Sequence, residues 1–231
     1  MKAVVLAGGK GTRFHPYTFV IPKPLMPIGE NPILLHLIHA FRKSGIREFL
    51  LSTGYQAELI RAYFCNGEKF GAQIKYFYGE KPLETAGPLS MMREEFTDDE
   101  LFFVINGDIY TEPRLGKMAD FARRQASDIV VGYVDRIEKS KFGVMTIEND
   151  RVRRIVEKPE QKFSISAGIY VMRGRVLAEI PDRFFTMPDL IRHYLEMGKP
   201  LRAYKIEDFW MGIEGADNME TVLKRIEGTD A

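Results

Sequence analysis

Cysteine and tryptophan are nearly absent from this sequence, which has one cysteine, Cys65, and one tryptophan among its 231 residues. A single cysteine excludes an intramolecular disulfide and argues against a cysteine-based metal site. Long hydrophobic runs are missing too, because no apolar stretch reaches the roughly 18 residues that a membrane-spanning helix needs. No secretory leader opens the chain. These absences predict a soluble, cytoplasmic protein without a membrane partner.

An excess of either charge is also lacking. The chain carries 33 basic and 32 acidic residues, a formal net charge of +1. No overall field would draw it to nucleic acid, so nucleic acid is not expected as a partner. A compact phosphate ligand held by a few local cations would still fit. With 45% hydrophobic and 12% aromatic residues, the chain can bury a sizeable core.

The first half of the chain alternates strand-like and helix-like segments. Strands are expected at residues 2–7, 47–55, 74–80 and 101–108, and helices at 31–44, 56–64 and 89–96. This alternation indicates right-handed crossovers and a doubly wound, mostly parallel, Rossmann-like sheet of the α/β class. Ligands of such sheets bind beyond the carboxyl ends of the strands. The loops at 8–13 and 106–109 are therefore expected at the ligand-binding edge.

After about residue 128 the pattern changes to short runs rich in β-branched and aromatic residues. These runs cover 128–134, 142–150, 151–159 and 167–174, and helices are expected at 187–198 and 217–228. They predict a small mixed-β extension of the first sheet. No internal repeat or long linker separates the halves. We therefore expect one domain over 1–231, with halves at 1–127 and 128–231.

Glycines follow the first predicted strand directly, in the stretch AGGKGTRF. They let backbone N–H groups approach a polyphosphate and form an anion-binding nest. The stretch lacks the Lys-Ser/Thr ending of a P-loop and the dinucleotide pattern G-x-G-x-x-G, so taken alone it reads equally well as a tight turn. Arg13 favours phosphate binding, because a guanidinium holds phosphate oxygens bidentately. Lys23, between Pro22 and Pro24, adds a point charge on a stiff segment.

These motifs together resemble those of the sugar-1-phosphate nucleotidyltransferases, which make nucleoside-diphosphate sugars. The matching stretches are G-G-K-G-T-R-F-H-P-Y-T from residue 8, P-K-P-L-M-P, N-P-I-L, E-T-A-G-P-L at 84–89, N-G-D at 106–108, F-G-V at 142–144, E-K-P at 157–159, A-G-I-Y at 167–170, M-P-D-L-I at 187–191 and F-W-M-G-I at 209–213. They cover nearly the whole chain in the family's order. The T-A-G-P-L turn looks most like mannose- or heptose-1-phosphate guanylyltransferases, so GTP is the favoured nucleotide, while uridylyl, thymidylyl and cytidylyl transfer stay open.

The resemblance implies in-line attack of a sugar 1-phosphate on the α-phosphorus of a nucleoside triphosphate, with pyrophosphate leaving. Arg13 would hold the pyrophosphate, Lys23 would bridge the α-phosphate and the attacking phosphate, and Asp108 would bind Mg²⁺. These three are the expected catalytic residues. The expected nucleotide-binding residues are Leu6, Ala7, Gly8, Gly9, Gly11, Thr12, Arg13, Thr85 and Gly87, with weaker candidates at Gln73 and Glu80.

The resemblance also assigns a sugar-phosphate set. Glu157 would accept hydrogen bonds from sugar hydroxyls, Lys158 would meet the sugar phosphate, and Gly143 would allow close backbone approach. Ser166 stands where an Asn is common in the family, and Lys23 completes the set. The substrates would be a nucleoside triphosphate and a sugar 1-phosphate, and a homo-oligomer stays open.

The last motif departs from the family, which usually has Trp, any residue, then a metal-binding Asp. Here Gly212 takes the place of that Asp. Three explanations stay open: Asp208 or Glu214 substitutes, Asp108 suffices alone, or the chain is a regulatory subunit that binds sugar nucleotides with little turnover. A dinucleotide-binding oxidoreductase is a further rival. It requires an acidic residue after the second strand, where only Glu58 is near, inside a predicted helix.

Overall fold

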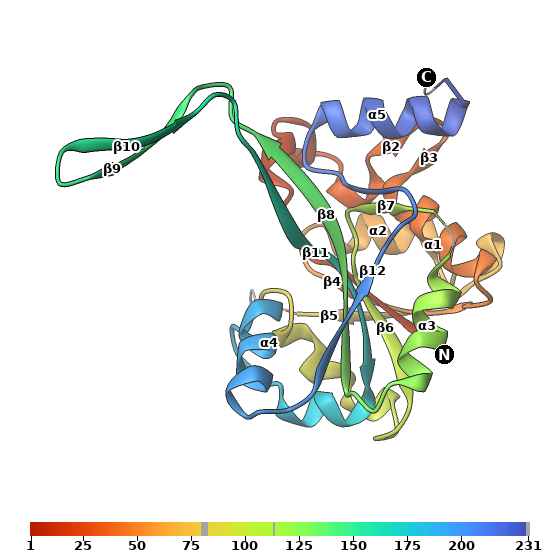
Figure 1. Ribbon diagram of the computed structural model, residues 1–231. Helices are drawn as coiled ribbons and strands as arrows, with labels where there is room; N and C mark the ends of the chain where they lie inside the picture. The colour runs from red at the N-terminus through yellow and green to blue at the C-terminus, as the bar shows by residue number, and fades with distance from the viewer. Residues whose placement is uncertain (80–82, 113, 230–231) are drawn as a thin grey trace.

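The computed structural model describes residues 1–79, 83–112 and 114–229. Their main sheet has seven strands in the order β12-β8-β11-β6-β1-β4-β5 (Figure 1). The strands are β1 (Ala3–Ala7), β4 (Glu48–Thr53), β5 (Gln73–Tyr78), β6 (Leu101–Asn106), β8 (Ile129–Lys139), β11 (Glu160–Arg173) and β12 (Leu201–Lys205). The strands β6, β1, β4 and β5 are parallel, whereas β11 runs antiparallel to both its neighbours. The predicted mostly parallel, Rossmann-like sheet is confirmed.

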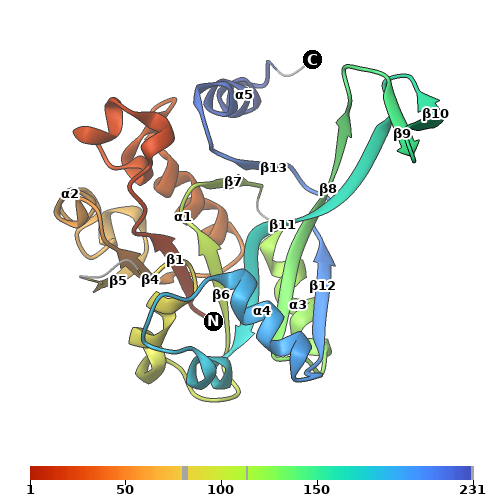
Figure 2. The ribbon, with the colours of Figure 1, turned by 90° about the vertical axis from the view of Figure 1, so that its left-hand side faces the viewer.

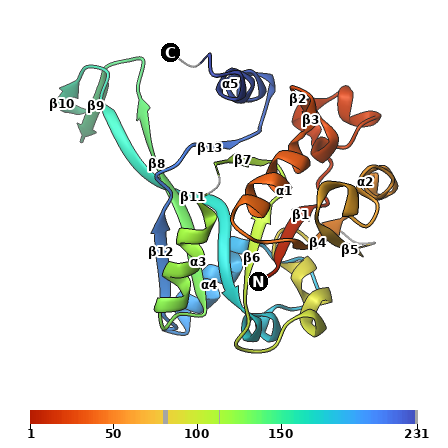
Figure 3. The ribbon, with the colours of Figure 1, turned by 90° about the vertical axis from the view of Figure 1, so that its right-hand side faces the viewer.

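Helices cover both faces of this sheet. The α-helices are α1 (Ile33–Lys43), α2 (Ala57–Phe64), α3 (Leu115–Arg124), α4 (Met187–Glu196) and α5 (Ala216–Glu227). Figure 3 shows α1 and α3 in front of the sheet and α4 behind it. Side chains of α1, α2 and α3 share one buried cluster with alternate strand residues, while those of α4 pack in a second cluster on the opposite face. Within the described residues, no helix has both the length and the apolarity that crossing a membrane would require.

Short 3-10 helices and two-stranded sheets connect the larger elements. The 3-10 helices are η1 (Thr12–Phe14), η2 (Tyr17–Phe19), η3 (Lys23–Leu25), η4 (Glu68–Phe70), η5 (Gly87–Glu95) and η6 (Gly174–Glu179). The two-stranded sheets pair β2 (Pro27–Ile28) with β3 (Asn31–Pro32), β7 (Ile109–Thr111) with β13 (Trp210–Gly212), and β9 (Val144–Glu148) with β10 (Arg151–Val156). The helix predicted at 89–96 is thus a 3-10 helix, and the sequence patterns did not predict α3.

The strands β8 and β11 continue beyond the sheet as an antiparallel ribbon, and β9 and β10 prolong it (Figure 1). We call residues 136–163 the arm. Its tip is a tight turn in which Asn149 and Asp150 have positive φ angles of 49° and 59°. Two consecutive residues of positive φ are typical of the hairpin turn whose twist matches its flanking strands. The strands β8 and β11 are longer than the runs at 128–134 and 167–174 that the sequence predicts.

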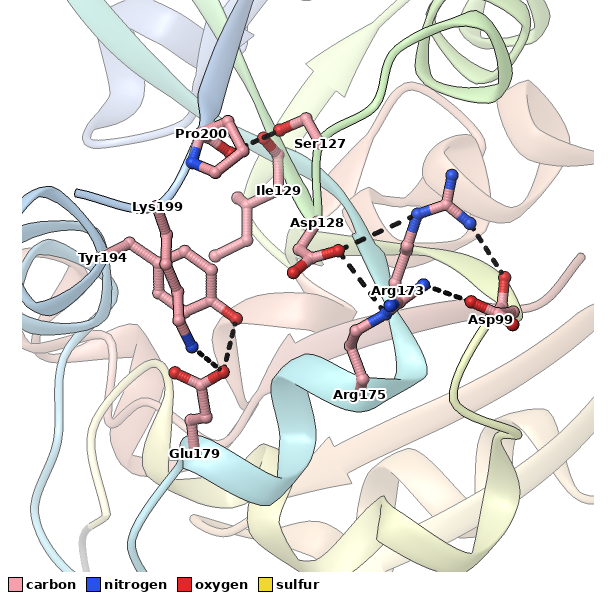
Figure 4. Close-up of polar contacts among 10 residues, drawn as sticks. All are labelled: Asp99, Ser127, Asp128, Ile129, Arg173, Arg175, Glu179, Tyr194, Lys199 and Pro200. Atoms are coloured by element: carbon pink, nitrogen blue, oxygen red, sulfur yellow. Dashed lines mark hydrogen bonds and ion pairs between the residues drawn. The ribbon is translucent and has the colours of Figure 1, made fainter. Parts of the chain in front are cut away.

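At the edge of the sheet opposite the loop after β1, polar side chains are paired with one another (Figure 4). Glu179 accepts hydrogen bonds from the Tyr194 hydroxyl at 3.1 Å and from Lys199 Nζ at 2.5 Å. Burial, together with the Glu179 charge, raises the pKa of the Tyr194 phenol. Asp128 lies 3.5 Å from Nε of Arg175. These contacts join η6, α4 and the start of β8, so the cluster serves to hold the fold.

Phe41 tests the packing of the larger core cluster. Its ring is fully buried and lies 5.2 Å from the Phe103 ring and 6.0 Å from the Phe49 ring, between centroids. We expect Phe41→Ala to lower the free energy of unfolding by about 3–5 kcal/mol, because truncation leaves a cavity that the sheet cannot fill. Urea denaturation measures this loss. Phe184→Ala, at a side chain that is 61% exposed, should change stability by less than about 0.5 kcal/mol, and equal losses in both variants would contradict the assignment.

Candidate functional site

A pocket of about 800 Å³ opens at the carboxyl ends of β1, β4, β5 and β6. This is the edge at which parallel α/β sheets bind ligands. All the residues that line it fall between Leu6 and Asp108. It brings together eight of the predicted site residues, namely Leu6, Ala7, Gly8, Gly9, Gly11, Lys23, Thr85 and Asp108. Segments far apart in sequence therefore converge at the place that the strand order predicted.

The glycine-rich loop between β1 and η1 owes its path to Gly11. This residue has a φ of +62°, in the left-handed region that favours glycine. A Cβ atom on Gly11 would lie 2.9 Å from the Cβ of Lys23, so the loop passes against that side chain. The Thr18 hydroxyl donates to the Gly11 carbonyl at 3.0 Å. The loop, η2 and Lys23 therefore form one packed unit.

Lys23 and Asp108 form the charged centre of the pocket. Nζ of Lys23 lies 2.6 Å from Oδ2 of Asp108, with the lysine side chain 13% exposed and the carboxylate 41% exposed. Pro22 and Pro24 flank the lysine in η3, and the Phe14 ring lies under its ammonium. Asp108 follows β6, and its carbonyl accepts from the backbone N–H of Ile213 at 2.8 Å. A fixed cation and a half-open carboxylate thus stand side by side, as phosphate and metal binding require.

Arg13 lies outside the pocket lining, in η1, together with Thr12. Its Nη1 is 3.1 Å from Oε2 of Glu214, and the two side chains are 70% and 69% exposed. An ion pair so open to water contributes little to stability, so the guanidinium can exchange partners readily. Glu214, which the sequence offers as a substitute metal ligand, thus pairs with Arg13. Asp208, the other candidate substitute, pairs with Arg114 at 3.1 Å.

The turn expected to meet the base reaches the pocket through Thr85 and Glu84. Thr85 also accepts a hydrogen bond from the backbone N–H of Met187 at 2.8 Å, through Oγ1. Gly87 is buried and does not line the pocket. A Cβ there would lie 2.6 Å from the Arg183 carbonyl oxygen. Gly87 therefore shapes the turn. Of the weaker candidates, Gln73 begins β5 at the far edge of the sheet, and Glu80 falls outside the described residues.

Ser166 lies on β11 where this strand changes partners. Its hydroxyl is 3.0 Å from the Tyr170 hydroxyl, and burial raises the pKa of that phenol. Between them Gly168 has a φ of +66°, and a Cβ there would lie 2.6 Å from Nδ2 of Asn106. Asn106 lines the pocket. Ser166 thus lies two residues before Gly168, which packs closely against the pocket residue Asn106.

Gly143, Glu157 and Lys158 gather at one point of the arm, where the β9–β10 hairpin begins. A Cβ on Gly143 would lie 3.0 Å from Oε2 of Glu157, and the Glu157 carboxylate is 3.8 Å from Lys158 Nζ. Both charged side chains are exposed, and Lys158 has a φ of +45°, which L residues rarely adopt. These three predicted sugar-phosphate residues therefore form a group of their own, and, unlike Lys23, they do not line the pocket.

Residues 2–225 match the family model described as nucleotidyl transferase. The chain belongs to the nucleotidyl transferase family. This confirms the resemblance that the glycine loop and the later motifs indicated. Among curated relatives, the mannose-1-phosphate guanylyltransferase catalytic subunit beta of Danio rerio is 37% identical over 221 residues, and mannose-1-phosphate guanylyltransferase 1 of Arabidopsis thaliana is 36% identical over 222 residues. Each match covers 92% of this chain and 61% of the relative. The chain thus spans about three-fifths of their length.

Solved structures share the fold of this chain. A Bacillus anthracis protein with a proposed glucose-1-phosphate thymidylyltransferase function superposes with a TM-score of 0.80 at 23% identity, covering 100% of this chain and 97% of that one. HddC from Yersinia pseudotuberculosis, solved in complex with GMP-PN, gives a TM-score of 0.75 at 24% identity and covers 97% of this chain and 99% of its own. At these identities the similarity shows a common architecture.

Gly212, where the chain departs from the family motif, lies near the charged centre. It pairs with Ile109, the residue after Asp108, in the β13–β7 sheet. A Cβ on Gly212 would meet only the Trp210 ring, at 3.6 and 3.8 Å, which is ordinary van der Waals contact. The indole of Trp210 is held by a 2.9 Å hydrogen bond to the Ala167 carbonyl. The position therefore has room for a Cβ atom, in the strand that pairs with the residue after Asp108. Among the described residues, no three His, Cys, Asp or Glu side chains group as metal ligands.

The predicted site residues left out part of the pocket wall. Lys10, Ser52, Thr53, Gly54, Tyr55, Tyr78, Pro88, Met91 and Asn106 also line the cavity. Several of them end β4, β5 or β6, so the rule that ligands bind at carboxyl strand ends could have found them from the predicted strands. Position 54 requires a glycine, because a Cβ there would lie 2.9 Å from the Gly8 carbonyl oxygen.

We expect Gly11→Ala to weaken binding of a nucleoside triphosphate by about tenfold or more, because strain at a positive φ of about 1–3 kcal/mol adds to the clash with Lys23. Titration with a fluorescent GTP analogue measures the change. Gly116→Ala is the matched control, since Gly116 has no atom within 4 Å of an added Cβ and lies at the start of α3. Unchanged affinity in Gly11→Ala would show that the position of Lys23 does not require a glycine at residue 11.

Proposed function

We propose that the chain transfers a guanylyl group from GTP to a sugar 1-phosphate of the mannose or heptose type, releasing pyrophosphate. The observation that carries this proposal is the Lys23–Asp108 pair, 2.6 Å apart at the mouth of a glycine-lined pocket. Family membership and the names of the guanylyltransferase relatives support it. The chemistry of such a transfer requires positioning and charge neutralisation more than a nucleophile in the protein.

In the proposed reaction, an oxygen of the sugar phosphate forms a bond to the α-phosphorus of GTP. The bond from that phosphorus to the bridging oxygen breaks, and its electron pair leaves with pyrophosphate. The N–H groups around Gly8 and Gly11 would bind the triphosphate, and Lys23 would stabilise the charge on the phosphates that meet at the reacting centre. Arg13 stands at the loop exit and would exchange Glu214 for the leaving pyrophosphate.

Asp108 is the residue that would hold a divalent cation, proposed to be Mg²⁺. Its carboxylate is partly exposed at the pocket, and Mg²⁺ is commonly bound by one or two carboxylates plus substrate phosphates and waters. One carboxylate therefore fits a cation held mainly by the nucleotide. When bound, Mg²⁺ supplies positive charge to phosphate oxygens that become more negative in the transition state.

The decisive experiment measures pyrophosphate release with each of the four nucleoside triphosphates against a panel of sugar 1-phosphates, with and without Mg²⁺. We expect the highest rate with GTP and a mannose- or heptose-type 1-phosphate, and we expect no sustained release when the sugar phosphate is left out. Activity with another base would change the nucleotide assignment alone. The absence of release with every pair, while GTP still binds, would favour a sugar-nucleotide-binding regulatory subunit, the function that Gly212 suggests.

Gly212→Asp should strengthen the cation site, because Gly212 pairs with the residue after Asp108 and a Cβ there makes only ordinary van der Waals contact with the Trp210 ring. We expect the Mg²⁺ concentration for half-maximal rate to fall by about tenfold, equivalent to about 1.4 kcal/mol. Gly116→Asp introduces the same charge in the first turn of α3, where an acidic residue is tolerated. An equal Mg²⁺ requirement in both variants would show that position 212 does not contribute to the cation site.

A further inference from the structure

The turn after β4, residues 54–56, lies against the glycine loop. The backbone N–H of Tyr55 donates to the Gly8 carbonyl at 3.3 Å. Gly54 makes this close approach possible, because a Cβ on it would lie 2.9 Å from the same carbonyl oxygen. Gly54 and Tyr55 also line the pocket. The turn therefore supports the beginning of the loop directly, at Gly8.

The same turn reaches the other end of the loop through η2. The Gly11 carbonyl accepts a hydrogen bond from the hydroxyl of Thr18, which is fully buried. The next residue, Phe19, has a carbonyl that accepts a 2.9 Å hydrogen bond from Nε2 of Gln56. In Figures 2 and 3 the segment between β1 and α1 lies beside α2, the helix that follows Gln56. A chain of contacts thus runs from Gln56 through η2 to the loop.

Gln56 stands in an unfavourable local position. Its backbone has a φ of 51° and a ψ of 39°, in the left-handed region that L residues rarely adopt. Because a carbonyl only accepts, the amide nitrogen faces Phe19, and Oε1 is buried without a hydrogen-bond partner in the part of the chain that the structure describes. Both features are unfavourable, and residues held in strained backbone conformations cluster at functional sites. The hydrogen bond to Phe19 is therefore a candidate for a functional contact.

The segment around η2 has little else to hold it. Its backbone hydrogen bonds join near neighbours, since the N–H of Phe19 donates to the Pro16 carbonyl at 3.0 Å and that of Val20 to the Tyr17 carbonyl at 3.1 Å. The side chains of Tyr17, Phe19, Val20 and Ile21 are between 41% and 72% exposed. Segments with few buried contacts open easily. A long-range hydrogen bond therefore has a large share in keeping this segment in place.

We propose that Gln56 is a positioning residue of the nucleotide site. Its hydrogen bond holds η2 in place, and η2 holds the Gly11 carbonyl through Thr18. The loop is then already in the conformation that binds phosphate, so less conformational freedom is lost when the nucleotide binds. Gln56 itself does not line the pocket and acts on the ligand through the loop. The inference rests on the proposed function for the identity of the nucleotide, whereas the mobility of the loop can be measured without any ligand.

Two substitutions at residue 56 separate a positioning role from a general effect on stability. Gln56→Met keeps the length of the side chain and removes the amide, and Gln56→Gly removes the side chain and relieves the positive φ. We expect both variants to bind a fluorescent GTP analogue about fivefold more weakly than the wild type, since both lack the bond to Phe19. We expect Gln56→Gly to unfold at a higher urea concentration than Gln56→Met, because only glycine adopts this backbone without strain.

Affinity and stability are thus expected to diverge. A GTP affinity that followed the unfolding midpoint of the two variants, or that stayed at the wild-type value in both, would overturn the inference. The control is Asn149→Gly, which relieves a similar φ of 49° in the turn between β9 and β10. It should leave the GTP affinity unchanged. An equal loss of affinity in the control would show that the effect does not come from the bond to Phe19, and the assignment to Gln56 would be wrong.

A double-mutant cycle tests the route through η2. Thr18→Val removes the hydroxyl that donates to Gly11 and keeps the shape of the side chain. If Gln56 acts through Thr18, Gln56→Met should weaken GTP binding by less than about twofold in the Thr18→Val background. A further loss as large as that in the wild-type background would show that the two contacts are independent, and it would overturn the proposed route.

Hydrogen exchange of the ligand-free chain separates this inference from the proposed function. We expect the backbone amides of residues 11–21 to exchange about fivefold faster in Gln56→Met than in the wild type, while those of α1 stay unchanged. Equal exchange in both proteins would overturn the inference, whatever the activity of the chain. A wild type that does not bind GTP would contradict the proposed function, and the exchange rates would then decide by themselves whether Gln56 positions the loop.

Discussion

The ion pair between Lys23 and Asp108 is the contact on which the pocket depends, because it joins the segment after β1 to the turn after β6. These strands are neighbours in the sheet, so the pair closes the gap between their carboxyl ends. Gly11 must lack a side chain for Lys23 to occupy its place, and the two prolines limit where the lysine backbone can go. The glycine loop, Lys23 and Asp108 thus together determine the shape of the pocket.

Local patterns were sufficient for most of the sheet and helices. The apolar run ending in Gly8 became β1, the segment closing on Gly45 became α1, and the C-terminal amphipathic segment became α5. The elements that the local patterns did not predict correctly depend on tertiary contacts. The helix α3 is amphipathic, but Gly116 and the charged residues around it weaken the local signal. Pro88 lies at the start of η5, where the chain forms a 3-10 helix that local periodicity does not separate from an α-helix.

The site residues divide in the same way, into those that local motifs place and those whose position depends on long-range strand pairing. Gly11, Lys23 and Asp108 were predicted from their motifs, and they line one pocket because strand order determines which loops meet. The position of Glu157 and Lys158 depends on how far β11 stays paired with β8, a register that the short runs of sequence do not contain. Gly87 shows a further limit, because a motif glycine can be required by packing against Arg183 without lining the pocket.

The pairing of β8 with β11 restricts how the arm can change in length. Side chains alternate between the two faces of a ribbon, so one added or deleted residue in either strand turns every later side chain to the other face. The β9–β10 hairpin already shows the one way around this restriction, because a bulge between Val152 and Arg154 absorbs a residue without changing the later pairs. A single-residue insertion before Met145 would therefore turn Met145 and Ile147 to the other face unless a second bulge absorbed it.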